Sequence, residues 1–339
     1  MSENLVLAGD IGGTKSNLAF FRGAPAAPET VLERSYQNRD FSGLDEVVRR
    51  FIADTGLSAA TACFGVAGAV VAGASHLPNL GWRLSEQALA RDLGLNEVSL
   101  INDLEANALG IATLAPEQFF TLNPGRPHPD GNRALIAAGT GLGMAMLIRD
   151  NGHDHDHERV LASEGGHMDF APRGAEQIAL LHHLAARHGH VSVERVVSGP
   201  GLANIYDFLK ARGEEEPDWL AERFEANADR SAVIAQAGLS GETAICVKAL
   251  DLFLSAYGAA AGNLALLALA TGGVYLGGGI APRLIEAFPA SGFMAAFAEK
   301  GRFAGLLADV PVHLVLEPKT ALFGAANQAL RRRDAPGRV

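Results

Sequence analysis

The feature that most constrains this chain is a glycine-rich turn between two short apolar runs near its start. Leu5–Ala8 and Asn17–Phe21 flank the polar segment GDIGGT, residues 9–14. Paired glycines allow the positive φ values that a tight turn requires, so the pattern predicts a β-hairpin. A Walker A loop is excluded, because that motif continues from its last glycine into Lys-Ser or Lys-Thr and then a helix.

The same turn is suited to binding an anion. The N–H groups of Gly12, Gly13 and Thr14 can converge on one point with no Cβ in the way. Asp10 beside that point would lie close to a phosphate-bound Mg²⁺, since Mg²⁺ takes few carboxylates and completes its shell with water and phosphate oxygens. The alternative is an ordinary hairpin. The turn alone does not decide between the two, because short glycine motifs are often false positives.

The composition is that of a globular, acidic protein. A chain of 339 residues predicts one large domain or two medium ones, and 48% hydrophobic residues can form a substantial core. The formal net charge of −10 argues against a general nucleic-acid or anionic-membrane partner. A protein of this charge that binds a nucleotide must concentrate its donors in backbone turns and around a metal.

Two features bear on the compartment. Cys63 and Cys246 lie far apart in apolar stretches, which predicts buried free thiols in a reducing compartment. The apolar tract 244–276 is interrupted by Lys248 and Asp251, so we expect a buried helix and a strand rather than a membrane span. The start of the chain shows no signal-peptide pattern. These observations predict a soluble, cytoplasmic protein.

Local signals also place several connections. Pro25 and Pro28 indicate a loop after the first hairpin. Ser85 is expected to cap a helix that runs to Leu93. The last helix is expected at 321–330, followed by a frayed tail.

A candidate catalytic carboxylate follows a predicted strand. Glu97–Ile101 reads as a strand that passes directly into a helix opened by Asn102 and Asp103. Open α/β sheets carry their functional groups at the carboxyl ends of strands. The helix N-terminus would keep Asp103 ionised, which suits a general base. The alternative is that Asn102 or Asp103 only caps the helix.

Residues 134–148, ALIAAGTGLGMAMLI, repeat the organisation of the opening hairpin. An apolar strand enters, Gly139-Thr140-Gly141-Leu142-Gly143 forms a turn, and a second apolar strand leaves. Two such units in one chain predict a duplicated α/β architecture with two phosphate-binding hairpins. This pairing is much more specific than either turn alone.

Two further segments have side chains or backbone suited to ligands. Glu164 and His167 flank two glycines, and their acceptors and donors match what a polyol requires, although a local ion pair is the alternative. The strand at 273–276 ends in Gly277, Gly278 and Gly279, whose bare backbone would allow a nucleoside to approach closely. By contrast, we interpret the histidine-rich stretch 153–157 as a solvated loop rather than a metal site, because no other ligands stand at fixed spacing.

Together these segments resemble one protein family over nearly the whole chain. They are GDIGGT (9–14), INDLEA (101–106), AAGTGLG (137–143), SEGGHMDF (163–170), VERVVSGPGL (193–202) and GGVYLGGGIAPR (272–283). On these residues the chain resembles the bacterial ATP-dependent glucokinases, which have the hexokinase or actin-like ATPase fold. The resemblance implies a two-domain, ribonuclease H-like α/β fold around a cleft. It implies a small domain (1–113 plus 317–332), a large domain (114–316) and a frayed tail (333–339).

The resemblance also implies the reaction. The γ-phosphoryl group of ATP would pass to the 6-hydroxyl of D-glucose, the first step of glycolysis, with Mg²⁺ as cofactor and a homodimer as the assembly. By matched position, Asp103 would be the base. The residues that contact the sugar would be Asn79, Asn102, Asp103, Glu164, His167 and Glu194. Those that contact the nucleotide would be Gly9, Asp10, Ile11, Gly12, Gly13, Thr14, Gly139, Thr140, Gly141, Gly277, Gly278 and Gly279, with Asp10 on Mg²⁺ through water.

Two alternatives stay open. The loop 75–82 lacks the Thr-Asn pair of typical members and the segment 65–69 lacks their proline, so another hexose or an amino sugar, such as mannose, fructose or N-acetylglucosamine, could be the substrate. A non-catalytic sugar sensor is the second alternative, disfavoured because the candidate base and the metal carboxylate are both present. The related repressor/open-reading-frame/kinase family is disfavoured because its cysteine-rich zinc motif is absent.

Overall fold

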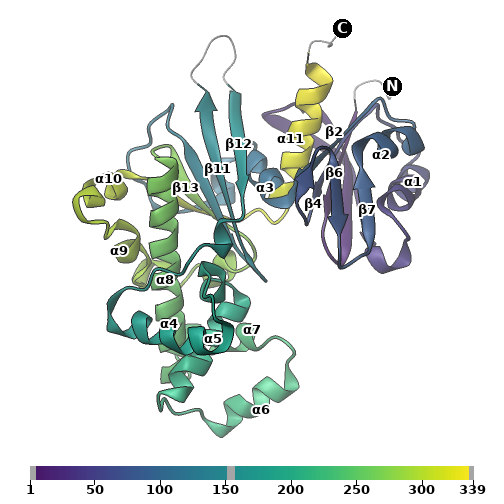
Figure 1. The fold of residues 1–339 in the computed structure, drawn as a ribbon. Coiled ribbons are helices and arrows are strands. Elements are labelled where there is room, and N and C mark those ends of the chain that lie inside the picture. The colour runs from purple at the N-terminus through teal and green to yellow at the C-terminus, as the bar shows by residue number, and fades with distance from the viewer. Residues whose placement is uncertain (1–4, 151–156, 336–339) are drawn as a thin grey trace. The chain divides into compact units, whose positions relative to one another are not determined.

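The structure, a computed structural model, describes residues 5–150 and 157–335. The chain divides into two compact units, which Figure 1 shows as ribbons. The smaller unit holds the described residues up to Gln118 and those from Glu317 on, and the larger runs from Phe119 to Leu316. The loop predicted at 153–157 lies outside the described residues, except for the backbone of His157, as does the end of the predicted tail. The expected domain bounds stay a prediction.

The smaller unit combines two sheets with four helices among its described residues. Its elements are β1 (Val6–Ile11), β2 (Lys15–Ala24), β3 (Ala27–Gln37), α1 (Leu44–Thr55), β4 (Thr61–Val66), β5 (Val70–Val71), β6 (Ala74–Leu77), β7 (Trp82–Ser85), α2 (Glu86–Leu93), β8 (Glu97–Asn102), α3 (Asp103–Ile111) and α11 (Thr320–Asp334). The main sheet has the order β3-β2-β1-β4-β8, and β5, β6 and β7 form a small antiparallel sheet. The predicted opening hairpin is confirmed, because β1 and β2 pair antiparallel.

The register of three parallel strands brings the candidate groups of this unit to one edge. Ile11 of β1 pairs with Val66 of β4, and Val66 pairs with Asn102 of β8. The carboxyl ends of parallel strands lie at the same edge of a sheet, where α/β proteins bind ligands. The glycine turn after β1 and Asp103 after β8 therefore start from one edge.

The core of the smaller unit depends on close approach between helices and sheet. The Phe20 and Phe51 rings, both fully buried, stack with their centroids 4.9 Å apart. Helix α11 returns from the end of the chain to pack against α3, β1 and β4. Figure 1 shows it between α3 and β2. A Cβ on Gly324 of α11 would collide with the carbonyl oxygen of Ala106 in α3, so glycine is needed for this close helix contact.

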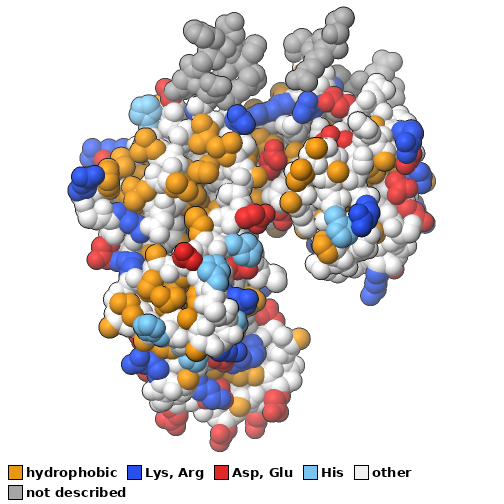
Figure 2. Space-filling view, viewed as in Figure 1, with side chains coloured by type: hydrophobic (Ala, Val, Ile, Leu, Met, Phe, Trp, Pro, Cys, Tyr) orange, Lys and Arg blue, Asp and Glu red, His pale blue; other side chains and the backbone are white. Residues whose placement is uncertain are grey.

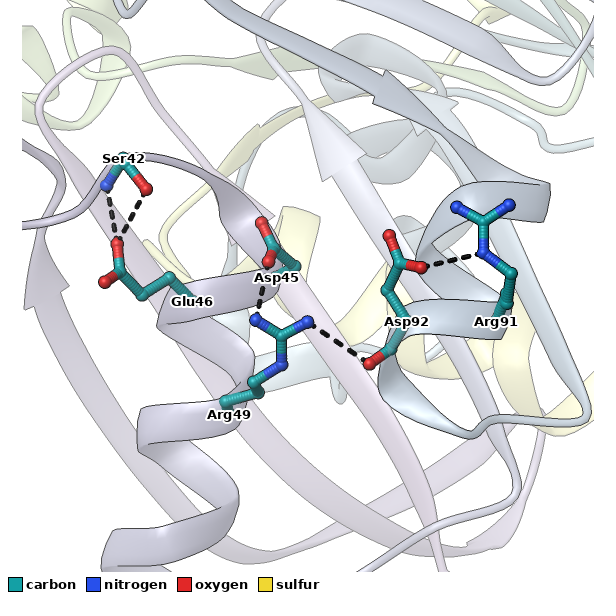
Figure 3. Close-up of polar contacts among 6 residues, drawn as sticks. All are labelled: Ser42, Asp45, Glu46, Arg49, Arg91 and Asp92. Carbon is teal, nitrogen blue, oxygen red and sulfur yellow. Dashed lines mark hydrogen bonds and ion pairs between the residues drawn. The ribbon is translucent and has the colours of Figure 1, made fainter.

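Polar contacts fix α1 against α2 on the surface of this unit (Figure 3). The backbone N–H and hydroxyl of Ser42 donate to Glu46 Oε2 at 2.7 and 3.0 Å, which closes the start of α1. Arg49 donates to Asp45 Oδ2 at 2.8 Å and to the carbonyl oxygen of Asp92 at 3.3 Å. Because Asp92 lies in the last turn of α2, Arg49 places a positive charge at the negative end of that helix.

The larger unit has a six-stranded sheet in the order β12-β11-β10-β13-β14-β9. Strands β10 and β11 form the predicted second hairpin, and β10, β13 and β14 run parallel. The strands are β9 (Phe119–Asn123), β10 (Arg133–Ala138), β11 (Leu142–Asp150), β12 (His157–Ser163), β13 (Gly273–Gly277) and β14 (Val312–Val315). The helices are α4 (Gly174–His188), α5 (Gly199–Ala211), α6 (Asp218–Ala226), α7 (Arg230–Leu239), α8 (Ala244–Ala268), α9 (Phe293–Ala298) and α10 (Ala304–Asp309), with short 3-10 turns η3 (Gly165–His167), η4 (Val193–Arg195) and η5 (Ala281–Leu284).

Helix α8 is the centre of the larger unit. It packs on β10, β11 and β13, and the hydroxyl of its buried Tyr257 donates to the carbonyl oxygen of Ile136 at 3.1 Å. The helix is long and apolar enough to cross a membrane, but 67% of its most apolar window is buried within the protein, as in a core helix. Figure 2 shows hydrophobic side chains over the visible face of the sheet and α8, and mostly charged ones around α6.

Several local predictions are corrected by the structure. The prolines at 25 and 28 do not mark an extended loop: residues 25–26 form a tight turn, and β3 begins at Ala27. The helix predicted to run from a cap at Ser85 to Leu93 is confirmed as α2, although the Ser85 side chain makes no hydrogen bond to the helix start. Helix α11 continues to Asp334, beyond the expected end at 330, and Arg333 in its last turn donates to the carbonyl oxygen of Gly23 at 2.9 Å. The prediction of two buried free cysteines is confirmed.

Candidate active site

The turn between β1 and β2 has two N–H groups available to a ligand. Its first N–H, on Gly12, closes the turn by donating to Lys15 O at 3.0 Å. Within the described part of the chain, the N–H groups of Gly13 and Thr14 have no hydrogen-bond acceptor. Two adjacent free donors on a short turn are a favourable arrangement for a phosphate oxygen.

A buried asparagine from outside the motif holds this turn in place. Asn38 donates through its backbone N–H to Thr14 O at 2.9 Å and through Nδ2 to Gly12 O at 2.8 Å. The hydroxyl of Ser16 donates to Asn38 Oδ1 at 2.7 Å, and both side chains are buried. Sequence reasoning missed Asn38, because its distance of more than 20 residues from the turn left no local signal.

Asp10 lies in β1 beside the turn, and its surroundings fit a cation. Asn17, its cross-strand partner, donates to Asp10 Oδ2 at 3.4 Å, and Ser35 donates to Asn17 Oδ1 at 2.9 Å. Burial raises the pKa of Asp10, against the opposing effects of the Asn17 hydrogen bond and the charge of Lys15. A desolvated carboxylate of this kind would gain from a nearby cation.

The donor set around Asp10 suits Mg²⁺ rather than a metal held by protein side chains alone. In the ranges 5–150 and 157–335, the structure contains no group of three or more His, Cys, Asp or Glu side chains that could enclose a metal ion. Mg²⁺ in phosphoryl-transfer sites is commonly held by one or two carboxylates together with water and phosphate oxygens. A single carboxylate beside a phosphate-binding turn matches that pattern.

Asn102 and Asp103 open α3 at the carboxyl end of β8. Asn102 Oδ1 accepts from the N–H of Leu104 at 2.8 Å, and Asn102 Nδ2 donates to Gly68 O at 3.1 Å. Asp103 Oδ1 also accepts from the N–H of Leu104, at 2.9 Å. The capping alternative is therefore present in the structure. It does not oppose a catalytic role, since the first turn of a helix stabilises the carboxylate that a base requires.

Glu105 completes this helix start. It follows Asn102 by three residues, and its carboxylate accepts a hydrogen bond from the Asn102 backbone, as in a capping box. Burial raises the pKa of Glu105 more than this hydrogen bond lowers it. The helix start thus holds two partly buried carboxylates with different surroundings.

Asn79 lies close to the first phosphate turn. It occupies the turn between β6 and β7, and its Nδ2 is 3.9 Å from the point where a Cβ on Gly13 would be. The sequence analysis treated 75–82 as a loop and missed these two short strands, between which only residues 78–81 form a turn. The small sheet places the exposed Asn79 amide over the glycine turn.

The turn between β10 and β11 in the larger unit has the same donor pattern as the first. The N–H of Gly139 closes it by donating to Gly141 O at 2.9 Å. The N–H of Leu142 donates to Glu194 Oε2 at 2.8 Å. In the part of the chain that the structure describes, the N–H groups of Thr140 and Gly141 have no acceptor. Both predicted phosphate turns therefore present two consecutive free N–H groups.

Glu164 and His167 flank the short turn η3. Both side chains are exposed, and no hydrogen bond or ion pair joins them, so the alternative of a local ion pair is not realised. The two glycines between them serve packing. A Cβ on Gly165 would lie 2.9 Å from Met144 Sδ, and one on Gly166 would collide with Leu142 O. Glycine lets η3 lie directly against the start of β11.

A cavity of about 830 Å³ in the larger unit includes the second phosphate turn. It lies among the N-terminal residues of α5, one side of α7 and the residues around η5, and sequence reasoning missed the contribution of α7. Its lining residues include Gly139, Thr140, Gly199, Ser231, Ala232, Ala235, Gln236, Gly279, Ile280, Arg283 and Leu284. The volume and mixed lining are those of a small-molecule or cofactor site.

One basic residue of the cavity is rigidly held. Arg230 donates to Asp207 Oδ1 at 2.8 Å, and its guanidinium carbon lies 5.5 and 4.7 Å from the ring centroids of Tyr206 and Phe224. These contacts fix the first turn of α7, whose N-cap Asp229 accepts from Ala232 N–H at 3.1 Å. The N-terminal end of α7 is therefore a stable wall of the cavity.

The three glycines after β13 have different functions. Gly279 lines the cavity, and a Cβ there would meet no atom within 4 Å. Gly277 packs on β10, where a Cβ would lie 3.0 Å from Leu135 Cδ1. Gly278 has φ +80°, and a Cβ there would collide with Ala138 O. Of the three, Gly279 is the residue that lines the cavity.

Comparison with known proteins supplies the family. The glucokinase family model matches residues 7–332. A glucokinase of Nostoc sp. (strain PCC 7120 / SAG 25.82 / UTEX 2576) is 41% identical over 343 residues, with 96% of this chain and 99% of that protein covered. A crystal structure of a glucokinase from an Antarctic psychrotroph has a TM-score of 0.86 and 32% identity, covering 96% of this chain and 98% of that one.

A more distant structure shares the fold alone. It is a glucokinase of the repressor/open-reading-frame/kinase family from Streptomyces griseus, solved with glucose and AMPPNP, with a TM-score of 0.63 and 20% identity over 96% of this chain and 99% of that one. The predicted two-domain fold class is confirmed by these neighbours. Because the family model covers almost the whole chain and the closer relatives agree with it over their full length, this chain belongs to the glucokinase family.

Proposed function

We propose that this protein transfers the γ-phosphoryl group of ATP to the 6-hydroxyl of glucose, giving glucose 6-phosphate and ADP. Among the features of its own structure, one observation supports the proposal most strongly. Two separate hairpin turns each present two consecutive N–H groups without an acceptor in the described chain, at Gly13–Thr14 and at Thr140–Gly141. Phosphoryl transfer requires positioning and charge stabilisation more than covalent chemistry by the protein, and backbone donors supply both.

Asp103 is the base in this proposal. Its carboxylate follows a parallel strand and lies in the first turn of α3, where the helix N-terminus and the N–H of Leu104 stabilise its charge. It accepts the proton of the 6-hydroxyl as the oxygen attacks phosphorus. Asn102 is held on both sides of its amide, by Leu104 and Gly68, so it presents a rigid neighbour to that hydroxyl.

Asp10 would hold Mg²⁺ through water, and the turn that follows Asp10 would take phosphate oxygens. Bound Mg²⁺ supplies positive charge that offsets the charge of the phosphates. Asn17 and Ser35 orient the carboxylate for this contact. Asn38 holds the turn itself.

The cavity of the larger unit is proposed to take the nucleoside. Thr140 at one part of its wall would contact phosphate, and the apolar Ala232, Ala235 and Ile280 would contact the base. Apolar walls gain from covering an aromatic ring, while Gln236 offers an amide for hydrogen bonding. Gly279 leaves room for the ribose.

Glu164, His167 and Glu194 are proposed to hold the sugar hydroxyls, with Asn79 as a further contact. The exposed Glu164 and His167 have no partner side chain in the described protein, so both are free to bind a polyol. We further propose a cytoplasmic homodimer with a small domain (1–113 plus 317–332) and a large domain (114–316). The resemblance to bacterial glucokinases supports these assignments.

A sugar panel tests the proposal. Initial ADP production would be measured with Mg-ATP and glucose, mannose, fructose, glucosamine or N-acetylglucosamine. A kcat/KM for glucose at least roughly tenfold above every other sugar is expected, because a sugar with a misplaced hydroxyl leaves polar groups of the site unpaired. A clear preference for another sugar would contradict the choice of glucose and direct attention to the Asn79 turn. No turnover with any sugar, in folded protein, would contradict the enzymatic assignment.

A further inference from the structure

The carboxylate of Glu194 lies against the second phosphate turn. Its Oε2 accepts from the N–H of Leu142 at 2.8 Å. A Cβ on Gly141 would lie 2.6 Å from the same oxygen, so the turn has no spare room there. The other oxygen, Oε1, has no hydrogen-bond partner among the residues that the structure describes.

The backbone around Glu194 is also bonded to this turn and to the cavity. The hydroxyl of Ser198 donates to Glu194 O at 2.7 Å, and the N–H of Gly199 donates to Gly139 O at 2.8 Å. The hydroxyl of Ser231, which lines the cavity, donates to Gly199 O at 2.6 Å. A continuous set of hydrogen bonds therefore runs from Glu194 through the phosphate turn to the cavity wall.

The turn is thus anchored at both ends. At its start, the N–H of Gly139 is bonded within the turn, and its end is held by the carboxylate of Glu194 on Leu142. The free N–H groups of Thr140 and Gly141 lie between these anchors. Their positions depend on where the Glu194 carboxylate lies. A hydrogen bond to a charged acceptor is among the stronger ones in proteins, so this anchor is sensitive to that carboxylate.

We propose that Glu194 is a positioning residue that couples the sugar to the nucleotide. One carboxylate oxygen accepts a sugar hydroxyl while the other holds Leu142, so a bound sugar orders the turn that takes phosphate. Sugar and nucleotide then raise each other's affinity by the same factor, as thermodynamic linkage requires. The inference rests on the proposed function, in which Glu194 contacts the sugar, and adds a second role for the same side chain.

The first test changes a residue of the phosphate turn and measures the affinity for glucose. Gly141→Ala places a methyl group against Glu194 Oε2, and Gly141 has no positive φ that would strain an alanine, so the flexible carboxylate must move. Gly139→Ala is the matched control for sugar binding, because a Cβ there meets nothing within 4 Å. Glucose binding would be measured by calorimetry without nucleotide, and AMPPNP binding with and without glucose.

Gly141→Ala is expected to weaken glucose binding about fivefold or more and to remove the glucose-dependent gain in AMPPNP affinity, while Gly139→Ala keeps the glucose Kd within about twofold. Wild-type glucose affinity in Gly141→Ala would overturn the proposal. Glucose turnover by the wild type distinguishes failure of the proposed function from failure of this inference. Without turnover the proposed function fails. If the wild type turns over glucose but the coupling in Gly141→Ala is unchanged, only the coupling role of Glu194 is refuted.

A second pair of variants keeps the proposal testable if Gly141→Ala does not fold. Glu194→Gln retains an oxygen that can accept from Leu142, whereas Glu194→Ala removes it. AMPPNP affinity without sugar should stay near the wild-type value in Glu194→Gln and fall about fivefold in Glu194→Ala. Equal AMPPNP affinities in the two variants would overturn the positioning role, because a residue that only contacts the sugar predicts no difference.

Discussion

Replacement of Asn38 by alanine should release the first phosphate turn and destabilise the smaller unit. The side chain makes a buried hydrogen bond with Ser16 at 2.7 Å and a part-buried one to Gly12 O at 2.8 Å. Its loss leaves the Ser16 hydroxyl, which is fully buried, and the Gly12 carbonyl without partners. An unsatisfied buried group costs about 1–3 kcal/mol, and only the Ser16 hydroxyl is fully buried, so the free energy of unfolding should fall by about 1–3 kcal/mol.

Urea unfolding and steady-state kinetics together test this account of Asn38. The KM for ATP should rise severalfold, because Gly12 O loses the Asn38 side chain, although the backbone N–H of residue 38 still holds Thr14 O. Asn96→Ala is the control, since Asn96 is an exposed asparagine of the same unit without a side-chain hydrogen bond in the described structure. A loss of stability below about 0.5 kcal/mol, the range of surface changes, would refute the energetic reasoning. Reduced stability with an unchanged KM for ATP would refute the link to the turn.

Two further predictions concern charges in the smaller unit. Burial raises the pKa of Asp10 in the folded protein above the unfolded value of 3.8. Ionisation of Asp10 therefore destabilises the folded state increasingly as the pH rises from 3.8 through the folded pKa, and has no effect below 3.8. Asp10→Asn should therefore raise the melting temperature of the ligand-free protein at pH 7 and leave it nearly unchanged at about pH 3.5. The same variant should abolish turnover. Equal shifts in melting temperature at both pH values would contradict this account. Arg49→Ala should lower the free energy of unfolding in urea by about 0.5–1 kcal/mol more than Arg50→Ala does. Arg49 pairs with Asp45 and Arg50 pairs with Asp54, each four residues away, but only Arg49 also reaches the end of α2. Equal costs would show that the contact with α2 contributes nothing.

Much of the fold followed from local patterns in the sequence. The paired glycines at 12–13 and the turn at 139–143 predicted hairpins, and Ser85 predicted the start of a helix that the structure begins at Glu86. These features depend on residues close together in the chain, where backbone preference and hydrophobic period act directly. The buried helix in the tract 244–276 was predictable for the same reason.

Strand β3 shows where local patterns mislead. Pro28 within it, Pro25 just before it and its mixed polarity favour a loop, yet Ala27–Gln37 pairs along the whole length of β2 at the edge of the sheet. An edge strand needs little burial and tolerates proline, so its hydrophobic pattern is weak. The strands on either side of Asn79 are short, so their hydrophobic pattern is also weak.

The candidate site was predictable as residue types but not as contacts. Asp10, Asp103 and Glu194 stood out in motifs, whereas Asn38 and the wall formed by α7 contribute through tertiary packing that leaves no spacing in the sequence. The glycines at 165 and 166 stood out only as the spacer between Glu164 and His167, whereas in the structure they allow close packing on β11. A motif shows that glycine is required without showing which neighbour requires it.

The central claim is that Asp103 takes the proton of the sugar hydroxyl, and one comparison tests it most directly. Asp103→Asn and Glu105→Gln change two carboxylates in the same turn of α3, both partly buried. The measurement is kcat with Mg-ATP and glucose, together with glucose binding by calorimetry. Asp103→Asn should lower kcat roughly 10²- to 10⁴-fold with little change in glucose affinity, while Glu105→Gln keeps most of the turnover. Near-normal kcat in Asp103→Asn would remove this residue from the mechanism, and a loss confined to Glu105→Gln would transfer the role to its neighbour.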